Sequence, residues 1–324
     1  MKTIAFMTGL GVTTVSRALK DAPDIGADTK ERVRMVARQV GYEPNPAGVR
    51  LRTGKTHVIS LIFSMEEEVL GLTSNMVYGI SEVLASTPYN LIITPYSHTK
   101  DPLAPVRYVL ETGSADGVII SRTEPDDARV KLLLERKLPF ATHGRTELGV
   151  DHAYHDFDNE DFAFKAVEKL AQHGRKRIAM LEPPRNLTFA RHLRDGFDAG
   201  LKAFGLEEAL FTTVDLDSSL SDVQAATRAL MMSDNPPDGL ISTSGAGFMA
   251  MTVGLESLGL TLGRDVDVVS KESSRILKWF RPELITCHED IKLAGRELAL
   301  AVLRQIEGAS PETLQTISRA ETLV

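Results

Sequence analysis

The 324-residue sequence lacks several features that would place it in other classes of protein. Its single cysteine, Cys287, excludes an internal disulfide and a cysteine-clustered zinc site. It has no apolar run of roughly 18 residues or more, so we expect no membrane span. Glycine and threonine interrupt the apolar start and no cleavage site follows, so we expect no secretory signal peptide. These absences favour a protein of the reducing cytoplasm.

Motifs for catalysis are also scarce. The sequence contains no Gly-x-Ser-x-Gly elbow, phosphate-binding loop or His-Glu-x-x-His helix. His152, His155 and Asp156 have a metal-like spacing, but they fall in an expected loop between a strand and a helix, and eight histidines make such a group unsurprising. We therefore expect no enzyme activity, no metal site and no cofactor.

Charge is divided unevenly along the chain. The net charge is −7, yet residues 1–56 carry ten Lys and Arg against five Asp and Glu. This segment, the head, therefore carries +5, and residues 57–324, the body, carry −12. A basic head on an acidic body indicates that the head meets a polyanion.

The first 41 residues predict three short helices. A helix, a turn at Gly9 and a second helix from Val12 to about Lys20 form the helix-turn-helix plan. The third helix is predicted to start with a capping box of Asp28 and Glu31. An apolar stripe then recurs at helical spacing, at Val33, Val36, Ala37 and Val40.

The second helix offers residue types that suit a DNA major groove. Its outer side carries Val12, Thr13, Ser16 and Arg17. Arginine can fork two hydrogen bonds to guanine, a hydroxyl can bond to several bases, and a methyl group can touch the thymine methyl. We therefore predict that this helix contacts bases.

Residues 42–56 predict a linker with one short helix inside it. Asn45 can cap this helix, Pro46 suits its first turn, and residues 47–52 continue it. Because so short a helix is unstable alone in water, we expect it to form only when it docks against a partner.

The body shows apolar, strand-like runs that alternate with amphipathic helical stretches. The expected strands are residues 58–63, 90–95, 117–120, 139–142, 177–181, 210–214, 239–242, 266–270 and 284–287. Apolar strands separated by helices predict parallel sheets covered on both faces. The pattern fits either a closed eight-fold barrel or two open, doubly wound lobes.

The head resembles the lactose-repressor family of bacterial transcription regulators. Residues 4–5, 9–11, 14–19, 29–33 and 41–45 match the family's motifs in order. The resemblance continues, more weakly, through the body. It implies an α/β protein in three parts: an all-α helix-turn-helix domain (1–41), a hinge helix (42–56) and a two-lobed body (57–324). The lobes are expected to be doubly wound parallel sheets of the periplasmic-binding-protein type (type I).

The resemblance also implies DNA contacts for particular residues. Val12, Thr13 and Arg17 are expected to contact base edges, and Thr14 and Ser16 the phosphate backbone.

In the linker, Leu51 is expected to wedge into a base step in the minor groove while Arg50 and Arg52 hold phosphates. Asn45 is included among the DNA-binding residues. The alternative for Leu51 is packing against the body.

A small effector is expected between the two lobes, at the carboxyl ends of the strands. The candidates on this ground are Ser64, Leu72, Thr73, Tyr96, Ser121, Arg145, Asp158, Arg191, Thr243, Ser244 and Lys271. Arg191 matches the family's sugar-binding arginine, which can fork two hydrogen bonds to vicinal hydroxyls or a carboxylate. The alternative for Arg191 is an ion pair with a surface acid.

In the head, Gly11 stands where the family commonly has a serine, and two places in the expected effector site also depart from the family's pattern. Lys271 stands where an aspartate is common, and Ser244-Gly245 replaces an Asn-Asp pair. Because a cation replaces an acceptor anion, we hypothesise an effector that carries a carboxylate or phosphate, or one that binds through a rearranged network of hydrogen bonds. A neutral sugar is the alternative.

The resemblance implies a sequence-specific repressor of carbohydrate uptake or catabolism genes, controlled by a sugar or sugar-derived effector. Two subunits are expected to pair through their bodies and present two heads to near-palindromic operator DNA. The protein is expected to be nucleoid-associated in the cytoplasm. The competing class is a periplasmic sugar-binding transport protein, for which the body fits but the head has no use.

Overall fold

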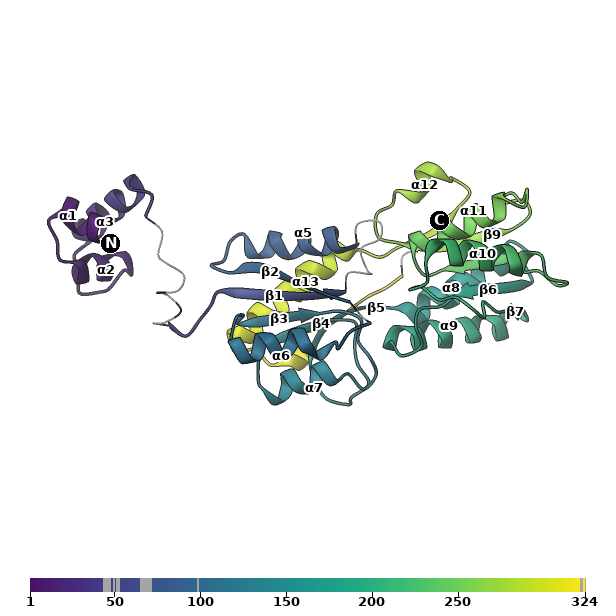
Figure 1. Ribbon diagram of the computed structural model, residues 1–324, viewed down its shortest axis with the longest axis horizontal. Coiled ribbons are helices and arrows are strands. Elements are labelled where there is room, and N and C mark those ends of the chain that lie inside the picture. Colours follow the sequence, from purple (N-terminus) through teal and green to yellow (C-terminus); the bar gives the residue numbers. More distant parts are fainter. Residues whose placement is uncertain are drawn as a thin grey trace. The chain divides into compact units, whose positions relative to one another are not determined.

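The computed structural model describes residues 1–42, 48, 50, 53–64, 72–97, 99–320 and 323. The chain forms two compact units, Met1–Thr56 and His57–Val324 (Figure 1). Asn45 and Leu51, predicted to contact DNA, lie outside the described residues, as does most of the predicted hinge helix. No helix in the described part of the chain is both long and apolar enough to cross a membrane.

The head contains the three predicted helices, α1 (Lys2–Thr8), α2 (Val12–Leu19) and α3 (Ala27–Gln39). Their shared core consists of Ile4, Ala5, Val15, Ala18, Val33 and Ala37. Gly9 ends α1 with a φ of 67°, a conformation that glycine adopts without steric cost.

The expected capping box of α3 is wrong. The residue that caps this helix is Gly26, and no side-chain hydrogen bond is made there. Asp28 lies inside the first turn, where its charge can interact with the helix dipole. The apolar stripe also ends early, because Val40 is exposed.

The first lobe of the body is built on a six-stranded parallel sheet with the order β11-β5-β4-β3-β1-β2. Its strands are β1 (Val58–Ser64), β2 (Asn90–Tyr96), β3 (Gly117–Ile120), β4 (Phe140–His143), β5 (Ala153–Phe157) and β11 (Gln315–Ser318). Its helices are α5 (Leu72–Leu84), α6 (Leu103–Thr112), α7 (Ala128–Glu135) and α13 (Ile291–Ile306).

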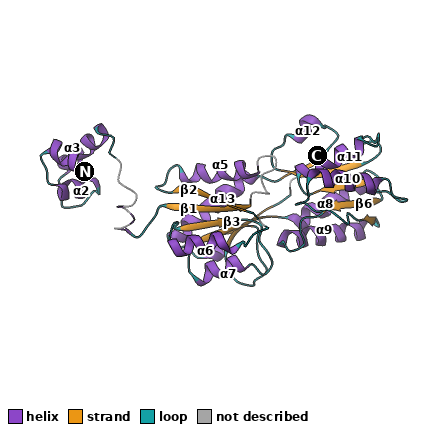
Figure 2. Ribbon diagram, viewed as in Figure 1, coloured by secondary structure: helices purple, strands orange, loops and turns teal. Residues whose placement is uncertain are grey.

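The second lobe is built on a five-stranded parallel sheet with the order β10-β9-β8-β6-β7. Its strands are β6 (Arg177–Leu181), β7 (Glu207–Ala209), β8 (Gly239–Ser242), β9 (Asp267–Glu272) and β10 (Ile285–His288). Its helices are α8 (Asn159–Gln172), α9 (Thr188–Phe204), α10 (Leu220–Met231), α11 (Gly245–Glu256) and α12 (Leu277–Phe280). Helices cover both faces of each sheet (Figure 2), so the body has two open lobes rather than a barrel.

The strand expectations missed β5, β7 and β11, and they wrongly placed a strand at residues 210–214. Strands β5 and β11 were not predicted, because β5 carries buried polar residues and β11 is a short edge strand with two exposed residues. His155 and Asp156 therefore lie in a strand and not in a loop. The run 210–214 is not a strand, since Phe211 and Val214 pack as loop residues against the second lobe's core. The apolar residues of this run indicate that it packs against the core, and they do not form a strand.

The chain crosses between the lobes three times: from β5 into α8, from β10 into α13, and from β11 to the C-terminal residues. After the last crossing, Ala320 and Leu323 join the core of the second lobe. These crossings bring the carboxyl ends of both sheets to the same region of the body.

Candidate functional site

Helix α2 presents the predicted base-reading residues on its exposed side. Val12, Thr13 and Arg17 are exposed, and Val15 and Ala18 face the core at helical spacing. The predicted backbone contacts, Thr14 and Ser16, are half-buried at the edge of the same side. Arg17 pairs with Asp24 at 2.6 Å, and both side chains are about half exposed. Because exposed ion pairs contribute little free energy, this guanidinium can exchange its partner for DNA.

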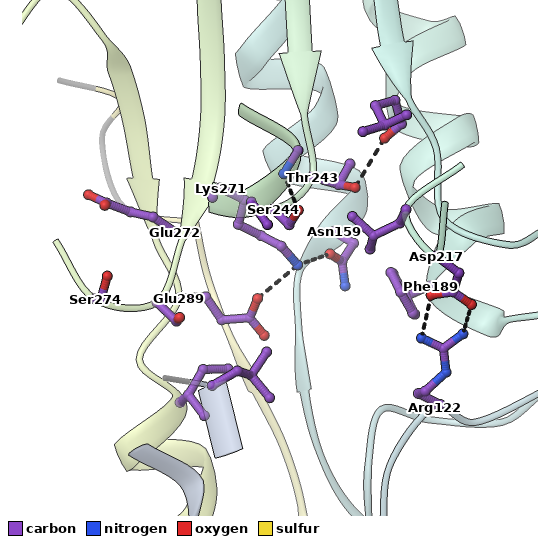
Figure 3. Close-up of a pocket in the computed structure, with 18 of the residues that line it drawn as sticks. Arg122, Asn159, Phe189, Asp217, Thr243, Ser244, Lys271, Glu272, Ser274 and Glu289 are labelled. Carbon is purple, nitrogen blue, oxygen red and sulfur yellow. Dashed lines mark hydrogen bonds and ion pairs between the residues drawn. The ribbon is translucent and has the colours of Figure 1, made fainter. Parts of the chain in front are cut away.

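A cavity of about 340 Å³ lies between the two lobes, at the carboxyl ends of their strands (Figure 3). Its apolar wall consists of Leu72, Leu181, Phe189, Leu216, Leu220, Val223 and Ile291. Its charged and polar groups include Arg122, His143, Asp156, Asn159, Asp217, Ser244, Lys271, Glu272 and Glu289. An apolar wall with a few fixed polar groups is typical of small-molecule sites.

Lys271 belongs to a compact polar cluster within the cavity (Figure 3). Its Nζ lies 2.8 Å from Glu289 Oε2 and donates to Asn159 Oδ1 at 2.9 Å. Burial alone would raise the pKa of Glu289, but Lys271, with His143 nearby, lowers it overall. The lysine charge is therefore matched by a carboxylate of the protein itself.

A second ion pair joins the lobes across the cavity. Arg122, after β3, donates to both carboxylate oxygens of Asp217, at 3.0 and 2.5 Å. Arg122 has a φ of 54°, and its carbonyl accepts a hydrogen bond from Arg129, which is buried against Asp127. Both partners of this inter-lobe pair are largely buried.

A third ion pair lies where β5 ends. Arg145 Nε is 3.2 Å from Asp156 Oδ2, and Asp156 lines the cavity. Burial raises the pKa of Asp156, although the charge of Arg145 opposes this shift. Burial is also the main cause that lowers the pKa of His192, and the positive charge of Arg145 lowers it further. This pair adds a further compensated charge beside the cavity.

Helix α11 begins at the cavity with small residues. Ser244 caps the helix by accepting from the Gly247 amide at 3.1 Å. A Cβ on Gly247 would lie 2.8 Å from Leu181 Cδ2 and from Ser242 Oγ, so the close approach requires glycine. Thr243 Oγ1 donates to the Leu181 carbonyl and holds the end of β8.

The eleven predicted effector residues separate into two groups. Leu72, Thr243, Ser244 and Lys271 line the cavity. The seven others lie outside its lining: Ser64, Thr73, Tyr96, Ser121, Arg145, Asp158 and Arg191.

Several of these outer residues have clear structural partners. The Tyr96 hydroxyl accepts from Arg129 at 3.2 Å, and Asp158 caps α8 by accepting from the Asp161 amide at 3.0 Å. Arg191 forms an ion pair with Glu147, which is the alternative to a ligand contact.

The sequence reasoning did not select Arg122, Asn159, Phe189, Asp217 or Glu289, which all line the cavity. The rule that ligand groups follow parallel strands could have found Glu289 and Arg122, which come just after β10 and β3. Asp217 and Phe189 lie in or beside loops whose position depends on tertiary packing.

His155 has a structural role, because it links strand β5 to strand β11. Its Nδ1 lies 2.8 Å from Thr316 Oγ1 and its Nε2 3.1 Å from Ser318 Oγ, which joins β5 to β11. Burial lowers the pKa of His155 to about 4. Among the residues that the structure describes, no group of three His, Cys, Asp or Glu side chains could hold a metal ion.

A helix-turn-helix head joined to a two-lobed body with a cavity between the lobes defines a class: DNA-binding regulators that sense a small molecule. A family model described as "Periplasmic binding proteins and sugar binding domain of LacI family" matches residues 56–319. A second, "Bacterial regulatory proteins, lacI family", matches residues 1–45. The chain belongs to the LacI family of bacterial regulatory proteins, as the sequence predicted.

Similar proteins include the HTH-type transcriptional regulator RafR of Escherichia coli, 31% identical over 97% of this chain and 94% of that protein. AglR of Rhizobium meliloti (strain 1021), also an HTH-type transcriptional regulator, is 29% identical over 100% and 92%. These relatives confirm the predicted function as a DNA-binding transcriptional regulator, and they give no support to a transport protein.

Solved structures show the same fold. The lac repressor dimer bound to operator and the anti-inducer ONPF has a TM-score of 0.85 at 20% identity, covering 99% of this chain and 96% of that one. A complex of the transcriptional regulator CelR with cellobiose has a TM-score of 0.72 at 23% identity, covering 99% and 97%.

Proposed function

We propose that this regulator is a repressor of carbohydrate genes whose effector is a neutral, polyhydroxylated sugar bound in the cavity between the lobes. The observation that carries the proposal is the pairing of the cavity's cations. Lys271 is matched by Glu289 and Arg122 by Asp217, while Asn159 and Ser244 offer uncharged polar groups. Phe189 also lines the cavity, and its aromatic ring is a surface of the kind that packs against a sugar ring.

This proposal replaces the earlier hypothesis of an anionic effector. That hypothesis treated Lys271 as a charge available to the ligand, but its ammonium group already contacts a carboxylate at 2.8 Å. Of the predicted effector residues, we retain Leu72, Thr243, Ser244 and Lys271 as direct contacts. Arg145 pairs instead with Asp156, which lines the cavity, while Asp158 caps α8 and Arg191 pairs with Glu147.

The remaining functional assignments follow the same scheme. Residues 1–41 bind operator DNA, residues 42–56 form the hinge and residues 57–324 sense the effector. Val12, Thr13 and Arg17 contact bases from the exposed side of α2. The protein acts in the cytoplasm and catalyses no reaction, in line with relatives that are named as transcriptional regulators.

A second copy of the chain is the proposed partner of the body. Large apolar side chains are exposed on α5, β2, α11 and α12 or just before α12: Tyr78, Ile92, Ile93, Met249, Val253, Ile276 and Trp279. Trp279 is 88% exposed, which is unusual for a residue of that size unless a partner covers it. We expect Trp279→Asp to shift the dimer toward monomer in sedimentation analysis, and an unchanged dimer would place the interface elsewhere.

The proposed function is tested by two binding measurements on the full chain. An electrophoretic shift with the DNA upstream of its own gene tests the head, and calorimetric titration with neutral saccharides tests the cavity. We expect a specific shift that one neutral saccharide changes. No shift at low salt would contradict the DNA-binding assignment for this promoter, and binding of sugar acids alone would contradict the neutral effector.

A further inference from the structure

We propose that the Lys271–Glu289 pair is a charge filter: Glu289 makes the cavity accept uncharged sugars and reject their carboxylate and phosphate derivatives. The inference rests on the proposed function. It adds the chemical class of sugar that can bind and the single residue that determines this class. The two partners come from the end of β9 and from the crossing between β10 and α13. They lie together at the cavity (Figure 3).

The ammonium group of Lys271 has its bonding capacity largely used. Its Nζ contacts Glu289 Oε2 at 2.8 Å and Asn159 Oδ1 at 2.9 Å, and lies 5.1 Å from the ring centre of Phe157. An ammonium group has three N–H donors, and two protein oxygens lie within hydrogen-bonding distance of this one. The nearby aromatic ring further stabilises its positive charge. An anionic ligand could bind this lysine fully only by displacing Glu289.

Glu289 cannot leave the cavity without a large cost. Its backbone amide donates to the Glu272 carbonyl at 2.9 Å, which fixes where its side chain starts. Its carboxylate is only 13% exposed, and its second oxygen lies 3.6 Å from His143 Nε2. If a ligand anion took Lys271, a buried carboxylate would lose its partner beside a second negative charge. Breaking a buried pair in this way is strongly unfavourable.

The rest of the cavity offers an anion no better partner. Arg122, the other arginine or lysine in the described lining, is held by both oxygens of Asp217. His143, which also lines the cavity, lies 3.6 Å from the carboxylate of Glu289. Glu272 and Asp156 add further carboxyl groups to the lining. A sugar hydroxyl can donate to these carboxylates and accept from Asn159 without breaking any ion pair. The lining therefore favours neutral ligands and opposes anions.

The test is a change of ligand class caused by one substitution. Glu289→Gln keeps the shape of the side chain and removes its charge, so Lys271 becomes available to an anion. Cellobiose, maltose, lactose and melibiose are first titrated into the wild-type chain by calorimetry at pH 7. The uronate, 1-phosphate and 6-phosphate forms of each sugar that binds are then titrated into the wild type and E289Q. We expect wild type to bind the charged forms on the order of a hundredfold more weakly than the neutral sugar. E289Q should recover at least tenfold for one charged form.

Three control variants separate the charge effect from other causes. Glu283→Gln removes an exposed carboxylate outside the cavity lining and should change neither affinity. The double variant K271M/E289Q has no lysine to bind an anion and should lose the gain seen in E289Q. Lys271→Met alone should weaken the charged forms further, which keeps the proposal testable if E289Q fails to fold.

The outcomes distinguish this proposal from the one on which it rests. Neutral binding by both proteins with no gain of charged ligands in E289Q overturns the charge filter and leaves the sugar-sensing function standing. Equal affinity of wild type for neutral and charged forms overturns it as well. Binding of no saccharide, neutral or charged, by either protein overturns the sugar-sensing function and the filter with it.

Discussion

The ion pair between Arg122 and Asp217 is predicted to hold the two lobes together. Both terminal nitrogens of the guanidinium, Nη1 and Nη2, donate to the carboxylate, and the side chains are only 12% and 16% exposed. Beside this pair, the Thr188 amide donates to the Thr123 carbonyl at 2.9 Å, again from one lobe to the other. We consider Asp217→Asn, which keeps the size of the side chain and removes its charge.

The size of the effect follows from the burial of the pair. Exposed ion pairs contribute about 0–1 kcal/mol, whereas breaking a fully buried pair costs about 3–5 kcal/mol. Side chains that retain slight exposure lie between these limits, so we expect a loss of about 2 kcal/mol. Since 1.4 kcal/mol corresponds to tenfold, this loss would shift the lobes toward the open arrangement by about thirtyfold.

The Thr188 amide provides a direct measurement of this opening. Thr188 is the first residue of α9, where backbone amides have no partner inside the helix. Its protection from hydrogen exchange therefore depends on the Thr123 carbonyl of the other lobe. Exchange mass spectrometry of the ligand-free chain should show this amide exchanging about thirtyfold faster in Asp217→Asn.

A matched control and a clear contrary result are available. Asp234→Asn removes an exposed carboxylate that does not line the cavity, and it should leave the exchange of Thr188 unchanged. Raising the salt concentration should reduce the difference between wild type and D217N only slightly, because a largely buried pair is weakly screened. Unchanged protection of Thr188 in a folded D217N protein would refute the reasoning.

Three further predictions concern the head, the packing of the first lobe and the response to acid. Arg17→Ala should weaken operator binding about five- to 150-fold in a gel-shift assay, since a bidentate base contact contributes about 1–3 kcal/mol. An equal loss in the exposed Arg38→Ala would show a general charge effect instead. Gly79→Ala should lower the free energy of unfolding by about 1–3 kcal/mol in urea, because its Cβ would lie 2.0 Å from the Lys292 carbonyl oxygen, and an unchanged midpoint would contradict the close packing of α5 on α13. The pKa of His155 falls from 6.5 to about 4 on folding, so the native state binds fewer protons and stability is lost as pH falls between these values, by about 3 kcal/mol. His155→Gln should remove most of that loss in urea titrations at pH 7 and pH 4.5, and an unaltered pH dependence would assign it to other groups.

The sequence predicted the architecture well where local signals were strong. Gly9, the spacing of Val15 and Ala18, and that of Val33 and Ala37 define the helices of the head, because turn chemistry and helical periodicity depend only on near neighbours. The apolar strands of the body were found for the same reason. Strand β5 was missed because His155 and Asp156 are polar yet buried, and their partners lie far away in the chain.

The sequence by itself determined the class of fold, the regulator family and the surface of α2 that faces outward, since all three follow from local patterns and ordered motifs. Only the tertiary structure decided the charge of the cavity. In the sequence, Lys271 is a cation available to a ligand. In the structure, Glu289 follows the end of the neighbouring strand β10, and its carboxylate lies 2.8 Å from the lysine ammonium group. Asp217 and Arg122 lie 95 positions apart and meet only because the two lobes face each other. Electrostatic pairing depends on distance in space, and a linear sequence does not contain that distance.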